Sequence, residues 1–483
     1  MRTLTAFAVV TVMLVGLALA LASNEVEYRG QTPLVDFEEP PPLLVEEAPD
    51  AVDTDTKPGT ALEVTGRLSH GTIPSASFDE LYVEVSLAAS ERTPERRPPL
   101  NVALVIDRSG SMHGEPMVQA REAARTFVNG LGEQDRITLV AFDHESEVLV
   151  EPTAVTSEGR RRLHAAIDRI HAGGTTNISG GLRDGFEAVE RQATDEMVNR
   201  VILMTDGIPN VGIIDHDGLA GKTRSIRQRG ITVSTLGFGP SYDARLMGAM
   251  AEEGSGYFRH ISNSADLELA FSNELNSLRD TVASGIEVEI RPRPGVKIER
   301  VIGFRSEEFS EGHRIAMGDM PAGGRLSAVV RLRIEELPVN ADQPLVDVRT
   351  EYVDRLSERP ARHQLAMAAD VSIDQEAVEA SVDNRVMARV EQLRTQDTIM
   401  EVMELYDRGE QQAATHQLER ERRRIRQARQ RYEIDEEEET AQQIDMLFDR
   451  VDDTVRNVPA RSARGRNSAA EVQVESIQLY RGQ

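Results

Sequence analysis

The pattern of apolar and polar positions changes character at about residue 99 and again at about residue 282. Between these points, the runs NVALVI (101–106) and VILM (201–204) are apolar on both faces, and ITLVAF (137–142) is nearly so. The run ITVSTLGF (231–238) also has the pattern of a strand. Strands of this kind suit a sheet that helices cover on both sides. Helical periodicity in the intervening segments predicts helices at 115–130, 157–171, 179–193, 216–229, 242–252 and 264–280. This alternation predicts an α/β domain with a doubly wound, mostly parallel, Rossmann-like sheet.

One further segment of this region is expected to run in the opposite direction. EVLVEP (147–152) follows ITLVAF so closely that only a hairpin turn fits between them. Parallel neighbours need a crossover connection of a dozen or more residues, whereas antiparallel neighbours need only a turn. EVLVEP is therefore predicted to be an antiparallel strand at the edge of the sheet.

The segments on either side of this region alternate apolar and polar residues with period two. LEVTGRL (62–68) and LYVEVSL (81–87) show this before the α/β region, and several segments within 282–373 show it afterwards. Such alternation is typical of strands half buried in an antiparallel sheet, and it predicts a β-sandwich. We infer that the strands of 61–98 complete the sandwich of 282–373. The α/β domain, residues 99–281, would then be inserted into a discontinuous sandwich.

The two ends of the chain have other compositions. Residues 23–60 are acidic and rich in proline, which predicts an extended linker. Residues 374–458 have helical periodicity and predict a C-terminal α-helical region. Residues 459–483 are expected to form a polar tail, within which VQVESIQLY could add an edge strand.

Residues 1–22 combine one early arginine with an apolar run from Ala6 to Ala22. The sequence Ala20-Leu21-Ala22 fits a signal-peptidase site, so the segment is expected to be either a cleaved signal peptide or a single membrane anchor. Both alternatives predict an extracytoplasmic protein, in the periplasm or at the cell surface. Membrane contact is expected only through this segment, because no other stretch approaches the ~20 apolar residues of a spanning helix.

Composition excludes several classes of function. The chain has 483 residues, a formal net charge of −26 and no cysteine. This length predicts two or three domains. The negative charge argues against nucleic acid as a partner, because phosphate binding needs a basic face. The lack of cysteine excludes disulfides, thiolate metal sites and cysteine nucleophiles.

Oxygen-bearing side chains follow the first strand of the α/β region. VALVI (102–106) leads into Asp107, and Ser109 and Ser111 lie on the loop behind it. Ligands of an open α/β sheet bind outside the carboxyl ends of its strands, which is where this loop is expected. A carboxylate with two hydroxyls suits a hard cation such as Mg²⁺. Taken alone, however, serines before a helix are more often helix caps.

Two more loops bring similar groups to the same edge of the predicted sheet. VILM leads into Thr205 and Asp206, and the glycine-rich loop GGTTNISGG (173–181) carries Thr175 and Thr176 just before a predicted helix. Asp206 could be an ordinary turn residue before a glycine, and Thr176 an ordinary helix cap. Because three loops supply carboxylates or hydroxyls to one rim, one shared ion explains them better than three coincidences.

The motifs DRSGSM, GGTTNI and TDG, in this order within one α/β domain, resemble those of the von Willebrand factor type A (VWA) domain and its metal-ion-dependent adhesion site. The resemblance covers about residues 99–281. Thr175 stands where the family has a glycine. The positions that match the family's metal site are Asp107, Ser109, Ser111, Thr176 and Asp206.

The resemblance implies a divalent cation, Mg²⁺ or else Mn²⁺ or Ca²⁺, held largely by neutral hydroxyls. Such an ion keeps most of its charge and an open coordination position, so it attracts a carboxylate from outside. The resemblance thus implies an adhesion or receptor-like protein that binds an acidic group of a protein partner through the ion. The wider architecture resembles bacterial extracytoplasmic proteins with this domain, and the calcium-activated chloride channel-like and inter-alpha-trypsin-inhibitor heavy-chain proteins, whose domain is also followed by a β-rich region.

No signature of catalysis accompanies these motifs, and we expect the protein not to be an enzyme. None of the ten histidines forms a zinc-binding spacing, and neither GxSxG nor GxxxxGK[ST] occurs. A metal-assisted hydrolase is the less favoured alternative; its general base would be Glu115, although a glutamate in the first turn of a helix also has an ordinary dipole explanation. A further alternative is an envelope assembly scaffold, which reversible, metal-dependent binding would distinguish from a receptor.

Overall fold

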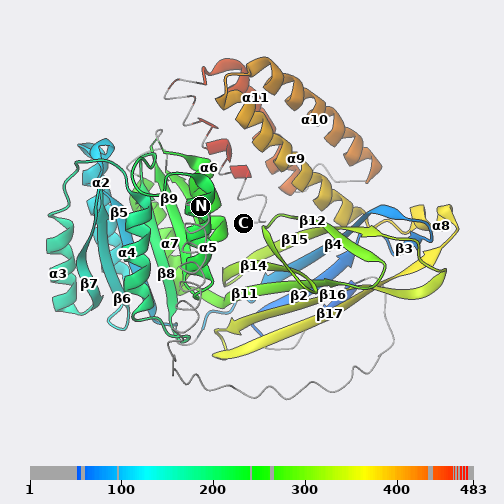
Figure 1. Ribbon diagram of the computed structural model, residues 1–483, viewed down its shortest axis with the longest axis horizontal. Helices are drawn as coiled ribbons and strands as arrows, with labels where there is room; N and C mark the ends of the chain where they lie inside the picture. Colours follow the sequence, from blue (N-terminus) through cyan, green and yellow to red (C-terminus); the bar gives the residue numbers. More distant parts are fainter. Residues whose placement is uncertain are drawn as a thin grey trace, which may run out of the picture. The chain divides into compact units, whose positions relative to one another are not determined.

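The computed structural model describes residues 52–55, 60–94, 97–239, 242–261, 266–432 and 439–460, with residues 462, 465, 468–469, 471–473 and 475–476. These residues form an α/β domain, a β-sandwich and a group of helices (Figure 1). The predicted signal peptide or anchor and most of the predicted linker lie outside them. In the described part of the chain, every helix is too short or too polar to cross a bilayer.

The α/β domain is built on one six-stranded sheet with the order β10-β9-β8-β5-β6-β7. β5 is central and buried along its whole length, and its neighbours β6 and β8 run parallel to it. β7 lies at the edge and pairs antiparallel with β6, as its short connection predicted. The strands are β5 (Leu100–Asp107), β6 (Arg136–Phe142), β7 (Ser146–Ala154), β8 (Val198–Thr205), β9 (Thr232–Phe238) and β10 (Ser255–Ile261).

Helices cover both faces of this sheet. α2, α3 and α7 share one hydrophobic cluster with it, and α4, α5 and α6 share another on the opposite face. The predicted doubly wound α/β fold is therefore confirmed. The helices are α2 (Glu115–Gly130), α3 (Ser157–Ile167), α4 (Ile178–Glu190), α5 (His216–Arg227), α6 (Ala244–Glu253) and α7 (Leu267–Arg279).

The sandwich consists of two sheets, and both combine strands from before and after the α/β domain. One sheet has the order β1-β2-β4-β15-β12, and the other has the order β13-β14-β11-β16-β17-β3. β4 pairs antiparallel with β15, and β3 pairs parallel with β17. The strands are β1 (Val52–Asp55), β2 (Leu62–Leu68), β3 (Thr72–Pro74), β4 (Phe78–Ala89), β11 (Thr281–Pro292), β12 (Val296–Ile302), β13 (Ser306–Phe309), β14 (Gly312–Pro321), β15 (Arg325–Ile334), β16 (Asn340–Asp354) and β17 (Arg359–Ser372).

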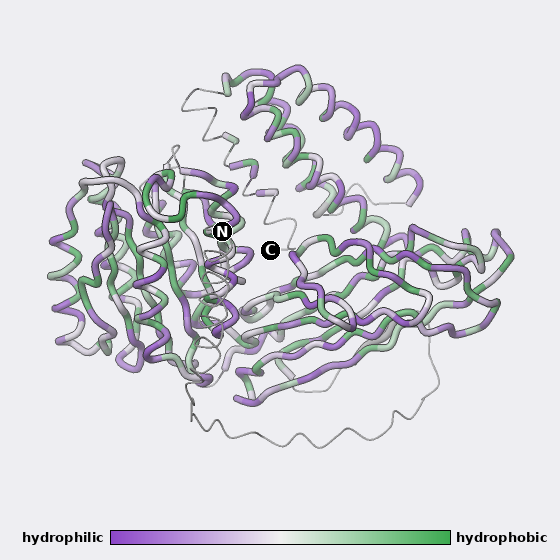
Figure 2. Tube along the Cα trace, viewed as in Figure 1, coloured by the Kyte–Doolittle hydropathy of each residue, from purple (hydrophilic) through white to green (hydrophobic). Residues whose placement is uncertain are grey.

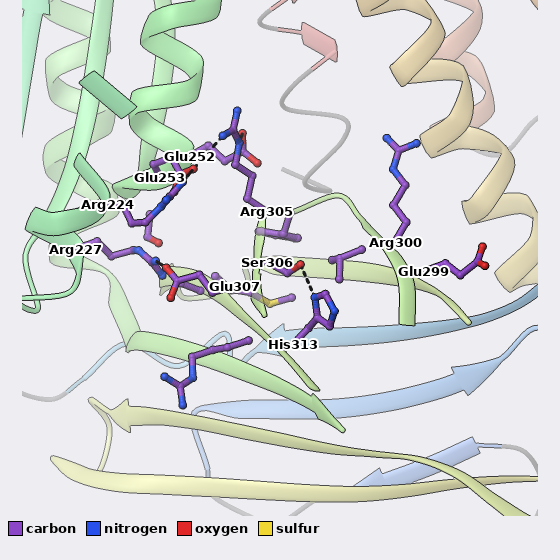
Figure 3. A pocket seen from close by; sticks show the side chains of 16 residues that line it. Arg224, Arg227, Glu252, Glu253, Glu299, Arg300, Arg305, Ser306, Glu307 and His313 are labelled. Atoms are coloured by element: carbon purple, nitrogen blue, oxygen red, sulfur yellow. Dashed lines mark hydrogen bonds and ion pairs between the residues drawn. The ribbon is translucent and has the colours of Figure 1, made fainter. Parts of the chain in front are cut away.

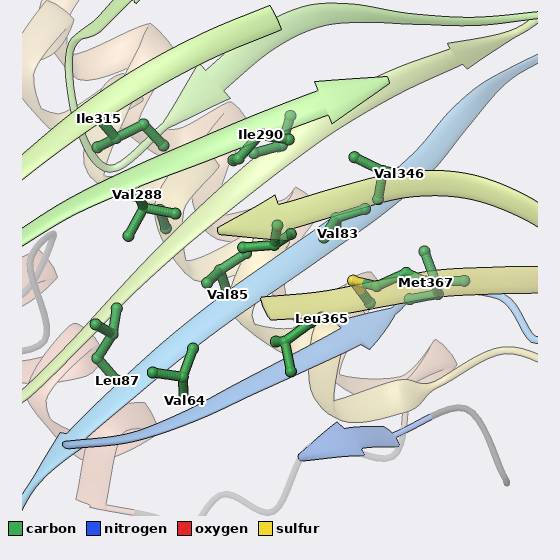
Figure 4. Packing of buried hydrophobic residues seen from close by; sticks show 14 of the residues in the cluster. Val64, Val83, Val85, Leu87, Val288, Ile290, Ile315, Val346, Leu365 and Met367 are labelled. Carbon is green, nitrogen blue, oxygen red and sulfur yellow. The ribbon is translucent and has the colours of Figure 1, made fainter. Parts of the chain in front are cut away.

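The apolar faces of the two sheets pack against each other. Figure 4 shows Val83 and Val85 of β4 between the sheets, together with Ile290 of β11 and Leu365 of β17. These residues belong to one continuous cluster of buried side chains. The α/β domain is thus inserted between β4 and β11, because the period-two strands on either side of it need each other to bury their apolar faces.

The C-terminal region contains α8 (Gln375–Ala380), α9 (Asn384–Asp407), α10 (Gln411–Arg431) and α11 (Glu439–Asn457). The first half of α9 packs on the outer face of the sandwich, where Val386 and Val390 join a cluster with Tyr82. Its second half packs with α10 and α11 in a separate cluster. Figure 2 shows α10 as largely hydrophilic, and its arginines pair with acidic residues nearby, as in Arg429–Asp445 at 2.9 Å.

Three details differ from the expectations. Within the predicted linker, Val52–Asp55 forms β1 on the free edge of β2, since backbone pairing at an edge needs no apolar signal. β10 was not predicted, because its sequence SGYFRHI lacks a continuous apolar run. Residues 471–473 of the predicted polar tail are helical, and Ala469 and Val472 are buried in the cluster of α9, α10 and α11.

Candidate metal centre

The first site loop begins where β5 ends at Asp107. Every residue of β5 is buried, so the strand carries this carboxylate to the sheet's edge without exposing it; Asp107 is 0% exposed. The backbone N–H of Ser109 donates to Asp107 Oδ1 at 2.7 Å, and the Thr205 hydroxyl donates to Asp107 Oδ2. Both bonds fix the orientation of the carboxylate. Thr205, at the end of β8, thus helps to position the Asp107 carboxylate.

The hydroxyls of the same loop connect it to the end of β8. Ser109 Oγ and Ser111 Oγ are 3.0 Å apart, and Ser111 Oγ donates to Asp206 Oδ1 at 2.6 Å. Ser109 and Asp206 are buried, whereas Ser111 is exposed. The predicted DxSxS loop and the predicted final aspartate are therefore brought together, with one side open to solvent.

Thr176 joins this group from the loop before α4. A methyl group placed on Gly207, the residue after Asp206, would lie 3.0 Å from Thr176 Oγ1 and 3.5 Å from Ser111 Oγ. The two hydroxyls therefore line the same small space. Thr176 is 4% exposed, so its hydroxyl is directed into the protein rather than into solvent. All five predicted site residues thus lie together at the carboxyl edge of the sheet.

The ordinary capping explanation of these hydroxyls does not hold. The N-cap of α2 is Gly114, and Ser109, at the start of the short 3-10 turn Gly110–Met112, makes no capping bond with its side chain. The N-cap of α4 is Asn177, whose side chain accepts from the N–H of Gly180. Ser109, Ser111 and Thr176 are thus free of the role that serine and threonine most often have before a helix.

Burial makes the charged forms of both carboxylates, Asp107 and Asp206, unfavourable. Burial and, to a lesser extent, the nearby Asp206 together raise the pKa of Asp107 to about 6, against the opposing effect of its hydrogen bonds from Thr205 and Ser109. Burial also raises the pKa of Asp206, opposed by the hydrogen bond from Ser111. A buried carboxylate shifts in this direction when no cation offsets the loss of hydration.

These residues fit a divalent cation. All their donor atoms are oxygens, which hard cations such as Mg²⁺ prefer. The hydrogen bonds to the two aspartates come from Thr205, Ser109 and Ser111, so hydroxyl and backbone groups rather than a cationic side chain partner these carboxylates. Since the described residues contain no cluster of three or more His, Cys, Asp or Glu side chains that could hold a metal, an ion here would depend on hydroxyls as well as carboxylates.

Two supporting residues were not predicted. Asn210 accepts from the N–H of Thr176 through its Oδ1 at 2.8 Å and donates its own N–H to the Thr176 carbonyl at 3.0 Å. Asp143, at the end of β6, pairs with Arg108 at 3.1 Å and accepts the N–H of Asn177 on its carbonyl. The sequence signal for Asp143 was present, because ITLVAF ends in an aspartate just as VALVI does. For Asn210, the sequence predicted only a turn and gave no indication that its side chain would support the site.

Glu115, the candidate general base of the hydrolase alternative, lies on the exposed side of α2. It occupies the first turn and accepts a hydrogen bond from Gln119 Nε2 at 2.7 Å, one helical turn further on. This is the local pairing expected of a surface helix. Among the described residues, no hydrogen bond or ion pair joins Glu115 to the five site residues, and its side-chain partner is Gln119.

A second hollow, of about 610 Å³, lies between α5, α6 and strands β12 to β14 (Figure 3). Its arginines and glutamates neutralise one another: Arg227 pairs with Glu307 at 2.5 Å, and Arg305 pairs with Glu253 at 3.1 Å. None of the predicted site residues lines it. This hollow is therefore part of the contact between the α/β domain and the sandwich, lined by ion pairs, and it is distinct from the candidate metal centre.

A doubly wound sheet with an oxygen-lined site at its carboxyl edge places the domain among Rossmann-like binding domains. Residues 101–274 match the family model of the von Willebrand factor type A domain. The chain therefore carries a VWA domain, and the resemblance seen in its motifs is confirmed. Domains of this family generally mediate protein interactions or adhesion.

Relatives support this assignment. Over 270 residues the chain is 27% identical to uncharacterized protein YfbK of Escherichia coli (strain K12), covering 54% of this chain and 46% of that protein. It is 26% identical over 253 residues to inter alpha-trypsin inhibitor, heavy chain 4, of Mus musculus, covering 50% of this chain and 26% of that protein. The matches thus span less than half the length of these curated relatives.

The fold extends beyond the VWA domain in a solved structure. The chain is similar to a von Willebrand factor type A protein from Catenulispora acidiphila, with a TM-score of 0.65 and 16% sequence identity. The similarity covers 82% of this chain and 92% of that one. The combination of an α/β domain with further strands and helices is therefore shared with that protein.

Proposed function

We propose that the protein binds a divalent cation at Asp107, Ser109, Ser111, Thr176 and Asp206, and binds a protein partner by accepting a partner carboxylate on that ion. Mg²⁺ is the proposed ion, with Mn²⁺ or Ca²⁺ as substitutes. The protein acts as an adhesion or receptor-like component outside the cytoplasm and catalyses no reaction. Nucleic acid is not a proposed partner, and the proposed membrane contact is limited to residues 1–22.

The observation that carries this proposal is the pairing of two desolvated carboxylates with three hydroxyls around one opening. Asp107 and Asp206 are 0% and 7% exposed, and both have raised pKa values. A cation between them would offset the cost of burial, while the neutral hydroxyls would leave part of its charge uncompensated. Ser111 is exposed, so an external carboxylate has access to that side of the ion.

Titration calorimetry of the full chain with MgCl₂ or MnCl₂ tests the metal site. One ion should bind per chain, and Asp107→Ala should abolish binding. The variant should remain folded, because it removes a buried carboxylate whose pKa shift disfavours its charged form. Asp217→Ala is the matched control, since Asp217 is exposed in the first turn of α5 and should not affect the ion. An unchanged stoichiometry in Asp107→Ala would refute the assignment.

The partner and the compartment need separate tests. Immobilised full-length protein should retain an envelope protein in Mg²⁺ and release it in EDTA; a complex that persists in EDTA would favour the assembly scaffold instead. Cell fractionation should recover the chain outside the cytoplasm. The hydrolase alternative gains no support from the position of Glu115, which pairs with Gln119 on the helix surface.

A further inference from the structure

The loop between β8 and α5 exposes an unusual amount of apolar surface. Among the described residues, eight large hydrophobic side chains are exposed, and five of them belong to the α/β domain. Three of these five lie in one seven-residue segment, IPNVGII, residues 208–214, which we call the isoleucine loop. Its exposed members are Ile208 at 59%, Ile213 at 38% and Ile214 at 55%.

The isoleucine loop adjoins the candidate metal centre. Ile208 is the second residue after Asp206, with only Gly207 between them. Further along, Asn210 exchanges two hydrogen bonds with the backbone of Thr176, at 2.8 and 3.0 Å. The loop is therefore bonded to one proposed metal ligand and continuous in sequence with another.

The C-terminal end of the isoleucine loop is also fixed by hydrogen bonds. The N–H of Ile213 donates to Ser179 Oγ at 3.0 Å, and that hydroxyl donates to Asn177 Oδ1 at 2.9 Å. Gly212 has a φ of 75°, and a Cβ there would lie 2.2 Å from Ser179 Oγ, so only glycine allows this close approach. The isoleucines are thus exposed by a well-anchored loop, not by a loose one.

We propose that the isoleucine loop determines specificity, and that it selects a partner carboxylate flanked by apolar side chains. This inference rests on the proposed function, because the isoleucine loop would contact a partner whose carboxylate is already bound to the ion. The ion would orient the acidic group, and burial of apolar area beside it would add affinity. A carboxylate flanked by charged groups would lose their hydration against Ile208 and Ile214 without compensation, which disfavours it.

Defined peptides serve as probes on the full chain in Mg²⁺. Ac-Leu-Asp-Leu-NH₂ carries the proposed combination, Ac-Gly-Asp-Gly-NH₂ keeps only the acid, and Ac-Leu-Asn-Leu-NH₂ keeps only the apolar groups. Affinities are measured by NMR titration with Mg²⁺ and repeated in EDTA. The leucine-flanked acid should bind about tenfold more tightly than the glycine-flanked acid. The asparagine peptide should not bind measurably.

The double variant Ile208→Ser/Ile214→Ser should reduce that preference to less than about twofold. The matched control is Leu269→Ser, because Leu269 is 62% exposed on α7 of the same domain and should leave the preference unchanged. Mg²⁺ titration of each variant verifies that the ion still binds.

The outcomes separate the two proposals. If neither acidic peptide binds in an Mg²⁺-dependent manner, the proposed function fails, and this inference fails with it. If both acidic peptides bind in Mg²⁺ with equal affinity, the ion captures carboxylates but the isoleucine loop does not select their neighbours, and only this inference is overturned. A preference that survives the double variant would overturn it equally.

Discussion

Arg200 of the VWA domain forms a buried ion pair with Asp319 of the sandwich. Nη2 of Arg200 lies 2.8 Å from Oδ2 of Asp319, and the two side chains are only 1% and 8% exposed. The same guanidinium lies 3.0 Å from Glu274 on α7, which is completely buried. One cation in β8 therefore neutralises two acids, one in its own domain and one in the other.

We predict that Arg200→Met destabilises the protein severely. The methionine would fill much of the space but leave Asp319 without its buried partner and Glu274 with only the more distant Arg259, at 3.9 Å, which costs about 3–5 kcal/mol. Thermal unfolding of the full chain measures the loss. The control is Arg245→Met, whose pair with Glu404 is about half exposed and worth about 0–1 kcal/mol. Equal losses in the two variants would contradict the buried network.

We predict that stabilisation by Mg²⁺ increases with pH. Asp107 titrates near 3.8 in an unfolded chain and at about 6 in the folded, metal-free protein. A raised pKa means that the folded state binds the proton more tightly, so the metal-free protein loses stability as the pH rises from 3.8 to about 6. The cation needs the ionised carboxylate and should offset that loss only above this range.

The measurement is the shift of the melting temperature by Mg²⁺ at two pH values. Because protons compete for Asp107, the apparent affinity should be about tenfold lower at about pH 5 than at about pH 7.5. Asp107→Asn should show no Mg²⁺-dependent shift at either pH, and Asp217→Asn should behave as the unaltered chain. A shift independent of pH would place the ion elsewhere.

We predict that Gly207→Ala weakens metal binding without unfolding the domain. The added methyl group would lie 3.0 Å from Thr176 Oγ1 and 3.5 Å from Ser111 Oγ, so it would crowd two proposed ligands. The dissociation constant for Mg²⁺ should rise by about tenfold, a loss of about 1.4 kcal/mol. Gly173→Ala is the control, since a Cβ there meets nothing within 4 Å. Identical affinities in both variants would remove Thr176 and Ser111 from the site.

We predict that the VWA domain folds by itself and that the second part of the sandwich does not. Residues 99–281 should unfold cooperatively as a fragment, with reduced stability because Arg200 has lost Asp319. Residues 282–373 lack β4, so the edge of β15 is unpaired and should drive aggregation. Co-expression with residues 60–98 should restore solubility. A well-behaved isolated 282–373 fragment would show that the insertion is not required for folding.

Apart from strand β10, the sequence alone was enough to predict the architecture of the VWA domain. Continuous apolar strands such as β5, separated by amphipathic helices, have few arrangements that bury both faces of a sheet. The oxygen-bearing residues could be found for a related reason: Asp107 and Asp206 each follow a parallel strand, and parallel strands end at one edge. The period-two strands could also be predicted from the sequence. Each has one apolar face that must be buried against another sheet, and this predicted the discontinuous sandwich.

Only the tertiary structure decided what these side chains do. Sequence could not distinguish Ser109 and Thr176 from helix caps; the fold shows Gly114 and Asn177 at the cap positions, which leaves the hydroxyls available. The hydrogen bonds of Asn210 to Thr176, and the burial of Arg200 between Glu274 and Asp319, depend on segments that come together only in the folded protein. Hydrophobic periodicity records which face of an element is buried, because burial acts residue by residue. Hydrogen bonds and ion pairs between distant segments leave no such periodic trace, since each depends on the spatial meeting of two particular groups.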